Sequence, residues 1–224
     1  MGKIITPIIK QLEQKHEQNL EIVNKQEEMH KALVEGNLES LQTCLREGTD
    51  LYSRSLIDCS TTLHSAAKGT SVEMVQMLIE NKVSPDLRDI NGQTPLHIAA
   101  AFGRDAIVQY LVEEMNEGAF IDIVRKNSRD TPLHTAIANG HKRIVQIILE
   151  NHPNINAFNN EGLTPLLSSA RSGNCDIVEL LLQAGAQLDC KDANGFSALH
   201  ISAVTGNHIA IVILLLDHGA DINA

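Results

Sequence analysis

The chain has 224 residues, a formal net charge of −10 at pH 7, 3% aromatic residues and no tryptophan. That charge argues against non-specific nucleic-acid binding, which needs a basic surface, and against an anionic membrane as the main partner. The scarcity of aromatic rings predicts thin layers packed through aliphatic side chains rather than one globule centred on large rings.

Residues 1–28 precede any repeated pattern. Apolar residues between Ile5 and Val23 mostly recur at helical spacings, which predicts one or two amphipathic helices, the first starting near Pro7. We expect an N-terminal helical cap that shields the apolar end of a repeat array. A coiled-coil or partner-binding helix is the alternative.

The first six residues, M-G-K-I-I-T, match the N-myristoylation pattern M-G-x-x-x-[ST] and make Gly2 a candidate acylation site. The pattern is short, and a glycine at this position is also a common remnant of cloning. No polybasic segment supplies the second signal that stable anchoring needs. Membrane binding is therefore not expected of this segment.

Residues 29–224 carry a repeated pattern. Related segments begin at Thr61, Thr94, Thr131, Thr164 and Ser197, separated by 33, 37, 33 and 33 residues. In the best-preserved copy, D-I-N-G-Q-T-P-L-H-I-A-A, the threonine suits a helix N-cap and the proline suits the first helical position. A second apolar stripe follows, so each unit is predicted to form turn, helix, turn, helix. No unit can bury its apolar face alone, and stacking is therefore required.

This pattern resembles the ankyrin repeat, D-x-x-G-x-T-P-L-H-x-A-A. The resemblance implies an all-α ankyrin-repeat solenoid with hairpin-like turns, made of one degenerate repeat and five clear repeats over residues 29–224. The last repeat has the character of an interior repeat, so we expect the array to continue beyond residue 224. Four extra residues within 113–127 predict a surface excursion, with a functional insertion as the alternative.

Four of the ten histidines hold the fourth position of the motif: His64, His97, His134 and His200. The resemblance implies that these rings hydrogen-bond within and between neighbouring turns. No histidine pattern typical of a metal site occurs, and no phosphate-binding glycine loop, nucleophile elbow or dinucleotide fingerprint is present. We therefore expect no catalytic residues, no metal and no cofactor in this segment.

The four cysteines, Cys44, Cys59, Cys175 and Cys190, form no C-x-x-C pair. Neither a zinc site nor a disulfide framework is indicated. The sequence has no signal-peptide pattern and no apolar run near 18 residues. We expect an intracellular, cytoplasmic location, with the nucleus as the alternative compartment.

The resemblance implies protein–protein recognition, as a scaffold or adaptor module that binds a protein partner as a monomeric array. The partner is expected on the concave face, which comprises the turn tips before each T-P-L-H motif and the last residues of each first helix. The candidate partner-binding residues are Ile90, Asn91, Gln93, Asn127, Ser128, Asp130, Asn160, Glu161, Leu163, Ala193, Asn194 and Phe196 in the turns, and Phe102, Asn139, Arg171 and Val204 at the helix ends.

Two other classes of function stay open. The array could be the targeting segment of a longer enzyme or of a bacterial effector, or the cytosolic ankyrin domain of a channel. The residues after Ala224 would discriminate. A catalytic motif there would favour the enzyme. A run of about 20 consecutive apolar residues would favour the channel, and further repeats ending in a polar cap would favour the scaffold.

Asn156 and Asn223 lie where ankyrin repeats are hydroxylated by an asparaginyl hydroxylase, as the resemblance implies. Asn223 is the better candidate, because Asp221 precedes it at the favoured spacing. The alternative is that both asparagines only tie down their turns. Incubation with the hydroxylase and its cosubstrates should add one oxygen to the peptide that carries Asn223; unchanged masses for both peptides would end the proposal.

Overall fold

The structure is a computed structural model of residues 1–224. It describes the backbone except at residues 1, 56–57, 115–120, 206–207 and 223–224, and side chains from residue 14 onward. Every regular element in the described part is an α-helix, and Arg54 and Thr61 add one isolated antiparallel bridge. The chain forms two compact units, Met1–Ser84 and Pro85–Ala224.

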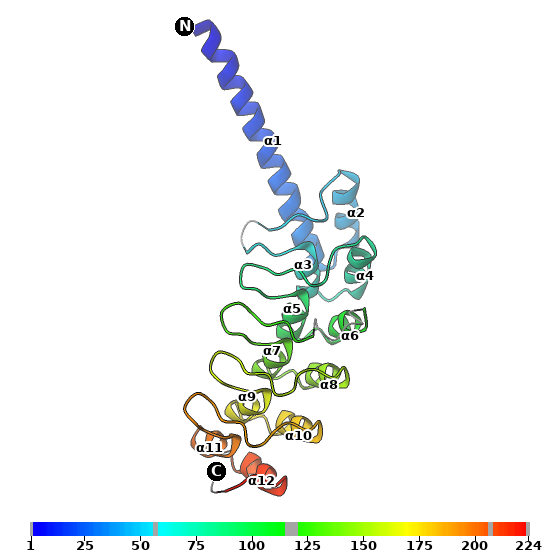
Figure 1. Ribbon diagram of the computed structural model, residues 1–224. Coiled ribbons are helices and arrows are strands. Elements are labelled where there is room, and N and C mark those ends of the chain that lie inside the picture. The colour runs from blue at the N-terminus through cyan, green and yellow to red at the C-terminus, as the bar shows by residue number, and fades with distance from the viewer. Residues whose placement is uncertain (1, 56–57, 115–120, 206–207, 223–224) are drawn as a thin grey trace. The chain divides into compact units, whose positions relative to one another are not determined.

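Unit one contains α1 (Gly2–Glu35), α2 (Leu38–Arg46), α3 (Thr62–Lys68) and α4 (Val72–Glu80). The C-terminal part of α1 packs against α2 and α3, and α3 packs against α4 (Figure 1). Met29 and Leu33 of α1 are completely buried in this core. The first, degenerate repeat therefore takes its first helix from the end of α1.

Helix α1 agrees with the sequence expectation of one or two helices before residue 29, but it ends later than that segment does. It runs without interruption from Gly2 to Glu35, so residue 28 lies inside a helix and marks no break in the backbone. Residues 14–22 are all exposed, and the first buried side chain of the described part is Met29. The described residues of the 1–28 segment therefore cover little apolar surface, and a capping role for this segment stays a prediction.

Unit two consists of helix pairs stacked in two layers (Figure 1). The first helices pack in the order α5, α7, α9, α11, and the second helices in the order α6, α8, α10, α12. The first helices are α5 (Pro95–Ala101), α7 (Pro132–Ala138), α9 (Pro165–Ser172) and α11 (Ala198–Val204), and the second are α6 (Asp105–Glu114), α8 (Lys142–Glu150), α10 (Cys175–Gln183) and α12 (Ile209–Asp217).

The T-P-L-H motif begins each first helix in the way its residue types predict. Thr94 is the extended N-cap of α5, Pro95 occupies the first helical turn, and His97 completes a capping box with Thr94. Ala99 and Ala100 are completely buried, and such small side chains let neighbouring first helices approach closely. Local capping and stacking therefore depend on the same few residues.

The turns before the motif occur in two forms. In the third repeat, Asp89 N–H donates to the Gln93 carbonyl (3.0 Å), Asp89 Oδ1 accepts from the N–H groups of Asn91 and Gln93, and Gly92 is left-handed at φ 73°. Asn159 and Asp192 hold their turns in the same way. The Asx side chain thus replaces backbone partners that a tight turn lacks.

The turn of the fourth repeat is one residue wider. It closes by a hydrogen bond from Arg125 N–H to the Asp130 carbonyl (2.9 Å), and Arg129 stands at φ 56° where the neighbouring turns have glycine. Cys59 has the same role, at φ 53°, in unit one. A side chain in this left-handed region costs about 1–2 kcal/mol relative to glycine.

Gly162 and Gly195 provide a matched test of how closely neighbouring turns approach. Both are left-handed, at φ 72° and 83°, but a Cβ on Gly162 would lie 2.6 Å from Ala193 N, whereas a Cβ on Gly195 would meet nothing within 4 Å. Both alanine variants should therefore lose about 1–2 kcal/mol through backbone strain. Gly162→Ala should lose about 1–3 kcal/mol more through overpacking.

Urea unfolding followed by circular dichroism measures this difference. Equal losses in Gly162→Ala and Gly195→Ala would show that the space between the turns is not limiting.

Candidate protein-binding face

The turns of unit two are held in place by buried imidazole rings. Thr94 N–H donates to His97 Nδ1 (3.2 Å), so Nδ1 is an acceptor and Nε2 carries the hydrogen. That Nε2 donates to the Asp130 carbonyl of the next turn (3.1 Å). A single neutral ring thereby caps its own helix and fixes the following turn.

Charging this ring is unfavourable. Burial lowers the pKa of His97 to about 4, against the opposing effect of its hydrogen bond to the Asp130 carbonyl, and the positive charges of Arg125 and Arg88 act in the same direction as burial. His134 repeats the arrangement, with Nε2 donating to the Leu163 carbonyl (3.0 Å) and with burial again lowering its pKa. The resemblance-based expectation for these two histidines is confirmed.

Most of the candidate partner-binding residues lie at the surface. The apolar ones are well exposed: Ile90 by 58%, Phe102 by 49%, Phe196 by 44% and Val204 by 74%. Gln93, Ser128 and Asp130 are half-buried, and the exposed remainder are Asn91, Asn127, Asn139, Asn160, Glu161, Arg171, Ala193 and Asn194. A partner could therefore reach the exposed members of this set.

Leu163 is a correction to the sequence prediction, because its side chain is only 2% exposed. Its carbonyl accepts the hydrogen bond from His134, and its N–H donates to Asn159 Oδ1 (2.9 Å). Leu163 therefore contributes to the interior and to the turn rather than to a binding face. Phe196 holds the equivalent place in the sixth repeat, where its exposed ring stacks on His200 with centroids 6.0 Å apart.

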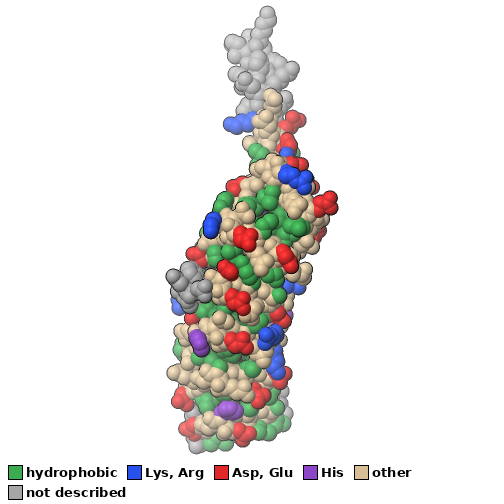
Figure 2. Space-filling view, turned by 90° about the vertical axis from the view of Figure 1, so that its right-hand side faces the viewer, with side chains coloured by type: hydrophobic (Ala, Val, Ile, Leu, Met, Phe, Trp, Pro, Cys, Tyr) green, Lys and Arg blue, Asp and Glu red, His purple; other side chains and the backbone are tan. Residues whose placement is uncertain are grey.

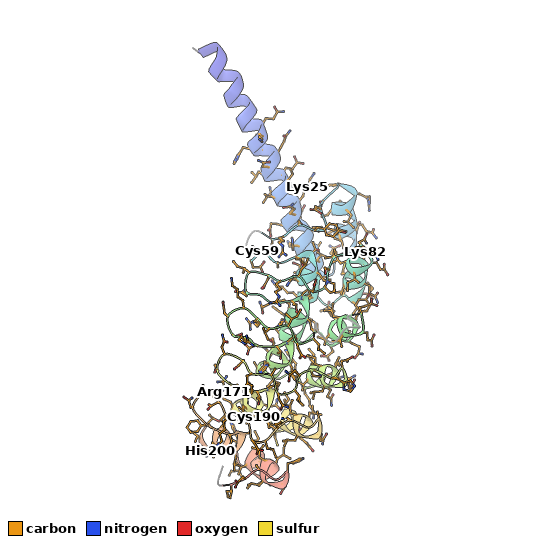
Figure 3. The ribbon with its side chains drawn as sticks, in the orientation of Figure 1. Lys25, Cys59, Lys82, Arg171, Cys190 and His200 are labelled. Atoms are coloured by element: carbon orange, nitrogen blue, oxygen red, sulfur yellow. The ribbon has the colours of Figure 1, made fainter. Side chains whose placement is uncertain are left out.

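Three of the predicted residues meet around one hollow. Asp130, Glu161 and Arg171 line a space of about 360 Å³ between the fourth and fifth repeats. Arg171, at α9 in Figure 3, forms an ion pair with Glu161, and Asn159 Nδ2 donates to Asp130 Oδ1 (2.9 Å). Because the ion pair is exposed, it adds less than about 1 kcal/mol to stability, and its charges can be exchanged for those of a partner.

Adjacent turn tips are bonded to one another. Lys126 N–H donates to the Asn91 carbonyl (3.0 Å), and Asn160 N–H donates to the Ser128 carbonyl (2.8 Å). The Asn160 side-chain amide also donates to the Asn127 carbonyl. The candidate residues are thus held on an ordered row of turns, which lowers the entropy lost on binding.

Sequence reasoning missed three residues of this region. Phe158 is 47% exposed. It stands six residues before Thr164, and Arg88 and Arg125 stand six residues before the threonines of their own repeats. This shared position in the repeat could have identified Phe158 from the sequence. Arg129 replaces a turn glycine. His141 Nε2 donates to the Ala101 carbonyl of the preceding repeat (3.2 Å), a contact that its place in a Gly-His turn does not specify.

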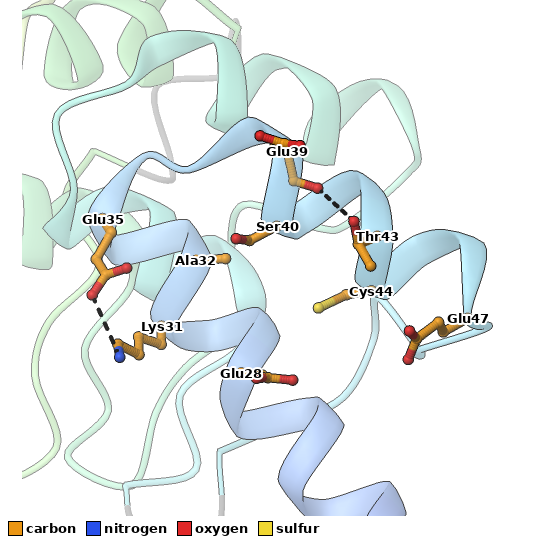
Figure 4. Close-up of a pocket in the computed structure, with 9 residues that line it drawn as sticks. All are labelled: Glu28, Lys31, Ala32, Glu35, Glu39, Ser40, Thr43, Cys44 and Glu47. Carbon is orange, nitrogen blue, oxygen red and sulfur yellow. Dashed lines mark hydrogen bonds and ion pairs between the residues drawn. The ribbon is translucent and has the colours of Figure 1, made fainter.

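A second hollow lies in unit one, between α1 and α2 (Figure 4), with a volume of about 360 Å³. Glu28, Glu35, Glu39 and Glu47 make it acidic, and Lys31 pairs with Glu35 at 3.8 Å. Nothing else at this place points to a ligand.

The second helices of unit two carry acidic side chains that are dispersed over their outer surface rather than gathered in one patch (Figure 2).

The structure bears differently on the two asparagines, Asn156 and Asn223, that are predicted to be hydroxylated. Asn156 is half-buried, and its Oδ1 accepts a hydrogen bond from Gln187 N–H of the next repeat (3.0 Å). This bond supports the structural role that the sequence left as the alternative. Asn223 lies outside the described residues, as do residues 115–120 of the predicted insertion. Hydroxylation of both asparagines and acylation of Gly2 stay predictions.

The part of the chain that the structure describes contains neither a metal site nor a helix that could span a membrane. No group of three or more His, Cys, Asp or Glu side chains is placed to hold a metal ion. All four cysteines are free. No described helix combines the length and the apolar character needed to cross a bilayer.

Stacked helix pairs, left-handed turn residues and imidazole bridges define a helical repeat protein whose turns project from the stacked helices. Residues 29–127, 115–192 and 159–224 match the family described as ankyrin repeats in three copies. The chain therefore belongs to the ankyrin-repeat family, whose fold mediates protein–protein interaction.

Similar proteins fall in several classes. The ankyrin repeat domain of Bcl-3 superposes with a TM-score of 0.75 at 28% identity, covering 87% of this chain and 86% of that one. The Drosophila melanogaster transient receptor potential cation channel subfamily A member 1 is 31% identical over 45% of this chain, and the Arabidopsis thaliana E3 ubiquitin-protein ligase KEG is 32% identical over 34%. The chain spans only 8% and 5% of the lengths of these two relatives.

The low pKa of His97 predicts that acid destabilises the stack. Between pH 6.5 and about 4 the unfolded state binds a proton that the folded ring does not, so the free energy of unfolding falls as pH falls through this window. At about pH 5.5 the titration of His97 alone should cost on the order of 1 kcal/mol relative to about pH 7.5.

Urea unfolding at these two pH values measures the loss. A His97→Gln variant keeps an N–H donor but does not titrate, so its stability should change less with pH. An unchanged pH dependence in His97→Gln would show that this ring is not the titrating group.

Proposed function

We propose that this chain is a protein-binding module that acts inside the cell as a scaffold or adaptor and captures a protein partner on the concave face of unit two. The observation that carries the proposal is the exposure of Phe102, Phe196 and Val204, which are large apolar side chains. Exposed apolar groups in polar surroundings mark interaction sites. Aromatic and arginine anchors commonly supply much of the binding energy.

The polar groups around these anchors support the same function. Arg171 and Glu161 offer both signs of charge, and Asn91, Asn160 and Asn194 are exposed on turns that the Asx hydrogen bonds hold. Such a surface can satisfy the hydrogen bonds of a partner without rearranging its own backbone. Binding should therefore proceed with little change of conformation.

The relatives support a role as one segment of a longer protein. They carry the names of a cation channel and of a ubiquitin ligase, and this chain matches only a small part of each. In such a setting the array would bring a partner, or a substrate, to an activity located elsewhere in the polypeptide. The binding face is the same in either case.

Replacing Phe102 and Phe196 by serine tests the proposal. Partners that wild-type protein retains from a cell extract should be identified by mass spectrometry and titrated individually by calorimetry. The double variant should lose about 2–4 kcal/mol of binding free energy, the range of interface hot spots. Its melting temperature should stay nearly unchanged, because both rings are exposed.

Leu38→Ser is the matched control, since Leu38 is also exposed, by 48%, but lies on α2 of unit one. It should retain the partner. Undiminished capture by the Phe102→Ser/Phe196→Ser variant would place the binding surface elsewhere. Early unfolding of that variant would show that the rings belong to the core.

A further inference from the structure

Four cations gather at the turns of the third and fourth repeats, although the chain as a whole carries a net charge of −10. Arg88, Arg125, Lys126 and Arg129 line one hollow of about 630 Å³. The exposed Ile90 contributes an apolar wall. By contrast, the hollow between α1 and α2 has one cation in its lining, Lys31, and the hollow between the fourth and fifth repeats has one, Arg171.

The wide turn of the fourth repeat places two of these cations. Arg129 stands in the left-handed conformation that glycine holds in the neighbouring turns, so its side chain is presented at a position where those turns have none. Lys126 N–H donates to the Asn91 carbonyl (3.0 Å), and a Cβ on Gly92 would lie 2.7 Å from Lys126 N. The missing side chain of Gly92 therefore allows the backbone of Lys126 to approach closely.

This placement has no evident role in folding. Glycine would fit the φ of Arg129 better, and strained residues retained at a surface point to function. Among the described side chains no ion pair engages Lys126 or Arg129. Both are exposed and are therefore available to a ligand.

The acids near the hollow do not neutralise it. Asp89 Oδ1 accepts from the N–H groups of Asn91 and Gln93, and Asp89 Oδ2 accepts from the Gln93 side-chain amide (3.0 Å). Asp130 lies 3.9 Å from Arg125. Arg125 is thus paired with Asp130, whereas the ion pairs of the described side chains leave Lys126 and Arg129 uncompensated.

We propose that this hollow binds an acidic peptide segment of the protein partner, with its carboxylates at Lys126 and Arg129 and an apolar side chain against Ile90. The inference rests on the proposed function and names the chemistry of one part of the partner. A peptide supplies both the charge and the apolar group that the hollow offers. A nucleic acid or an anionic membrane carries charge over a much longer surface than a short peptide, so it would meet stronger long-range repulsion from the negatively charged chain.

The direct test is fluorescence anisotropy with a labelled synthetic peptide of about 12 residues in which glutamates alternate with leucines. The wild-type chain should bind it at least about tenfold more tightly than a peptide with glutamine in place of glutamate. Affinity should fall as salt is raised, because exposed charges are screened beyond about 8 Å at physiological ionic strength.

Arg129→Gly separates binding from folding. The variant removes one cation and installs the residue type found in the neighbouring turns, so its melting temperature should not fall while its affinity for the glutamate peptide should drop about tenfold. Lys126→Gln/Arg129→Gln should weaken binding further. Lys142→Gln/Arg143→Gln on α8 changes net charge equally, at exposed positions outside the hollow, and should bind as wild type does.

Equal affinity for the two peptides would overturn the inference, and so would equal weakening by the α8 control pair. Preferential binding to phosphatidylserine vesicles over the glutamate peptide would also overturn it and would assign the cations to a membrane. The Phe102→Ser/Phe196→Ser variant should still bind the glutamate peptide, because neither ring lines the hollow. A failure of the peptide-binding test would therefore not contradict the proposed function, which the partner-capture experiment tests separately.

Discussion

A neutral imidazole that bonds in two directions is the constraint on which the middle of the array depends. His97 accepts from its own helix start and donates to the carbonyl of Asp130 in the next turn. The arrangement requires a buried, uncharged ring and a carbonyl of the next turn within hydrogen-bond distance of that ring. In the fifth repeat Leu167 replaces the histidine and is 1% exposed, so that junction relies on apolar packing instead. The array thus has a junction without an imidazole bridge directly after the one that His134 makes.

The outer positions of the turns carry different side chains in different repeats. Arg88, Arg125 and Phe158 occupy equivalent places before their threonines, yet they differ in size and charge. Because the turns are joined through backbone groups, such differences change the surface and leave the junctions intact. The same separation explains how a turn can present Arg129 at a position suited to glycine.

The repeat pattern in the sequence predicts most of the fold. Spacing of the T-P-L-H segments located the first helices, since capping and proline chemistry act within a few residues. The wider turn before Thr131 was not predicted, because its closure depends on a hydrogen bond from Arg125 to Asp130 that no local motif encodes. Leu163 was misplaced for a related reason: whether a turn side chain points inward depends on its neighbour. The continuity of α1 past residue 28 was missed, because the periodicity was interrupted by polar residues that are tolerated on an exposed helix.

Helix α1 makes the first repeat mechanically unlike the others. Its 34 residues correspond to about 50 Å of rigid rod, and its last turns carry Met29 and Leu33, both completely buried. A force or torque applied near residue 14 is therefore delivered to the core of unit one without an intervening hinge. A molecule that binds the exposed part of this helix can therefore alter the packing of α1 against α2 and α3.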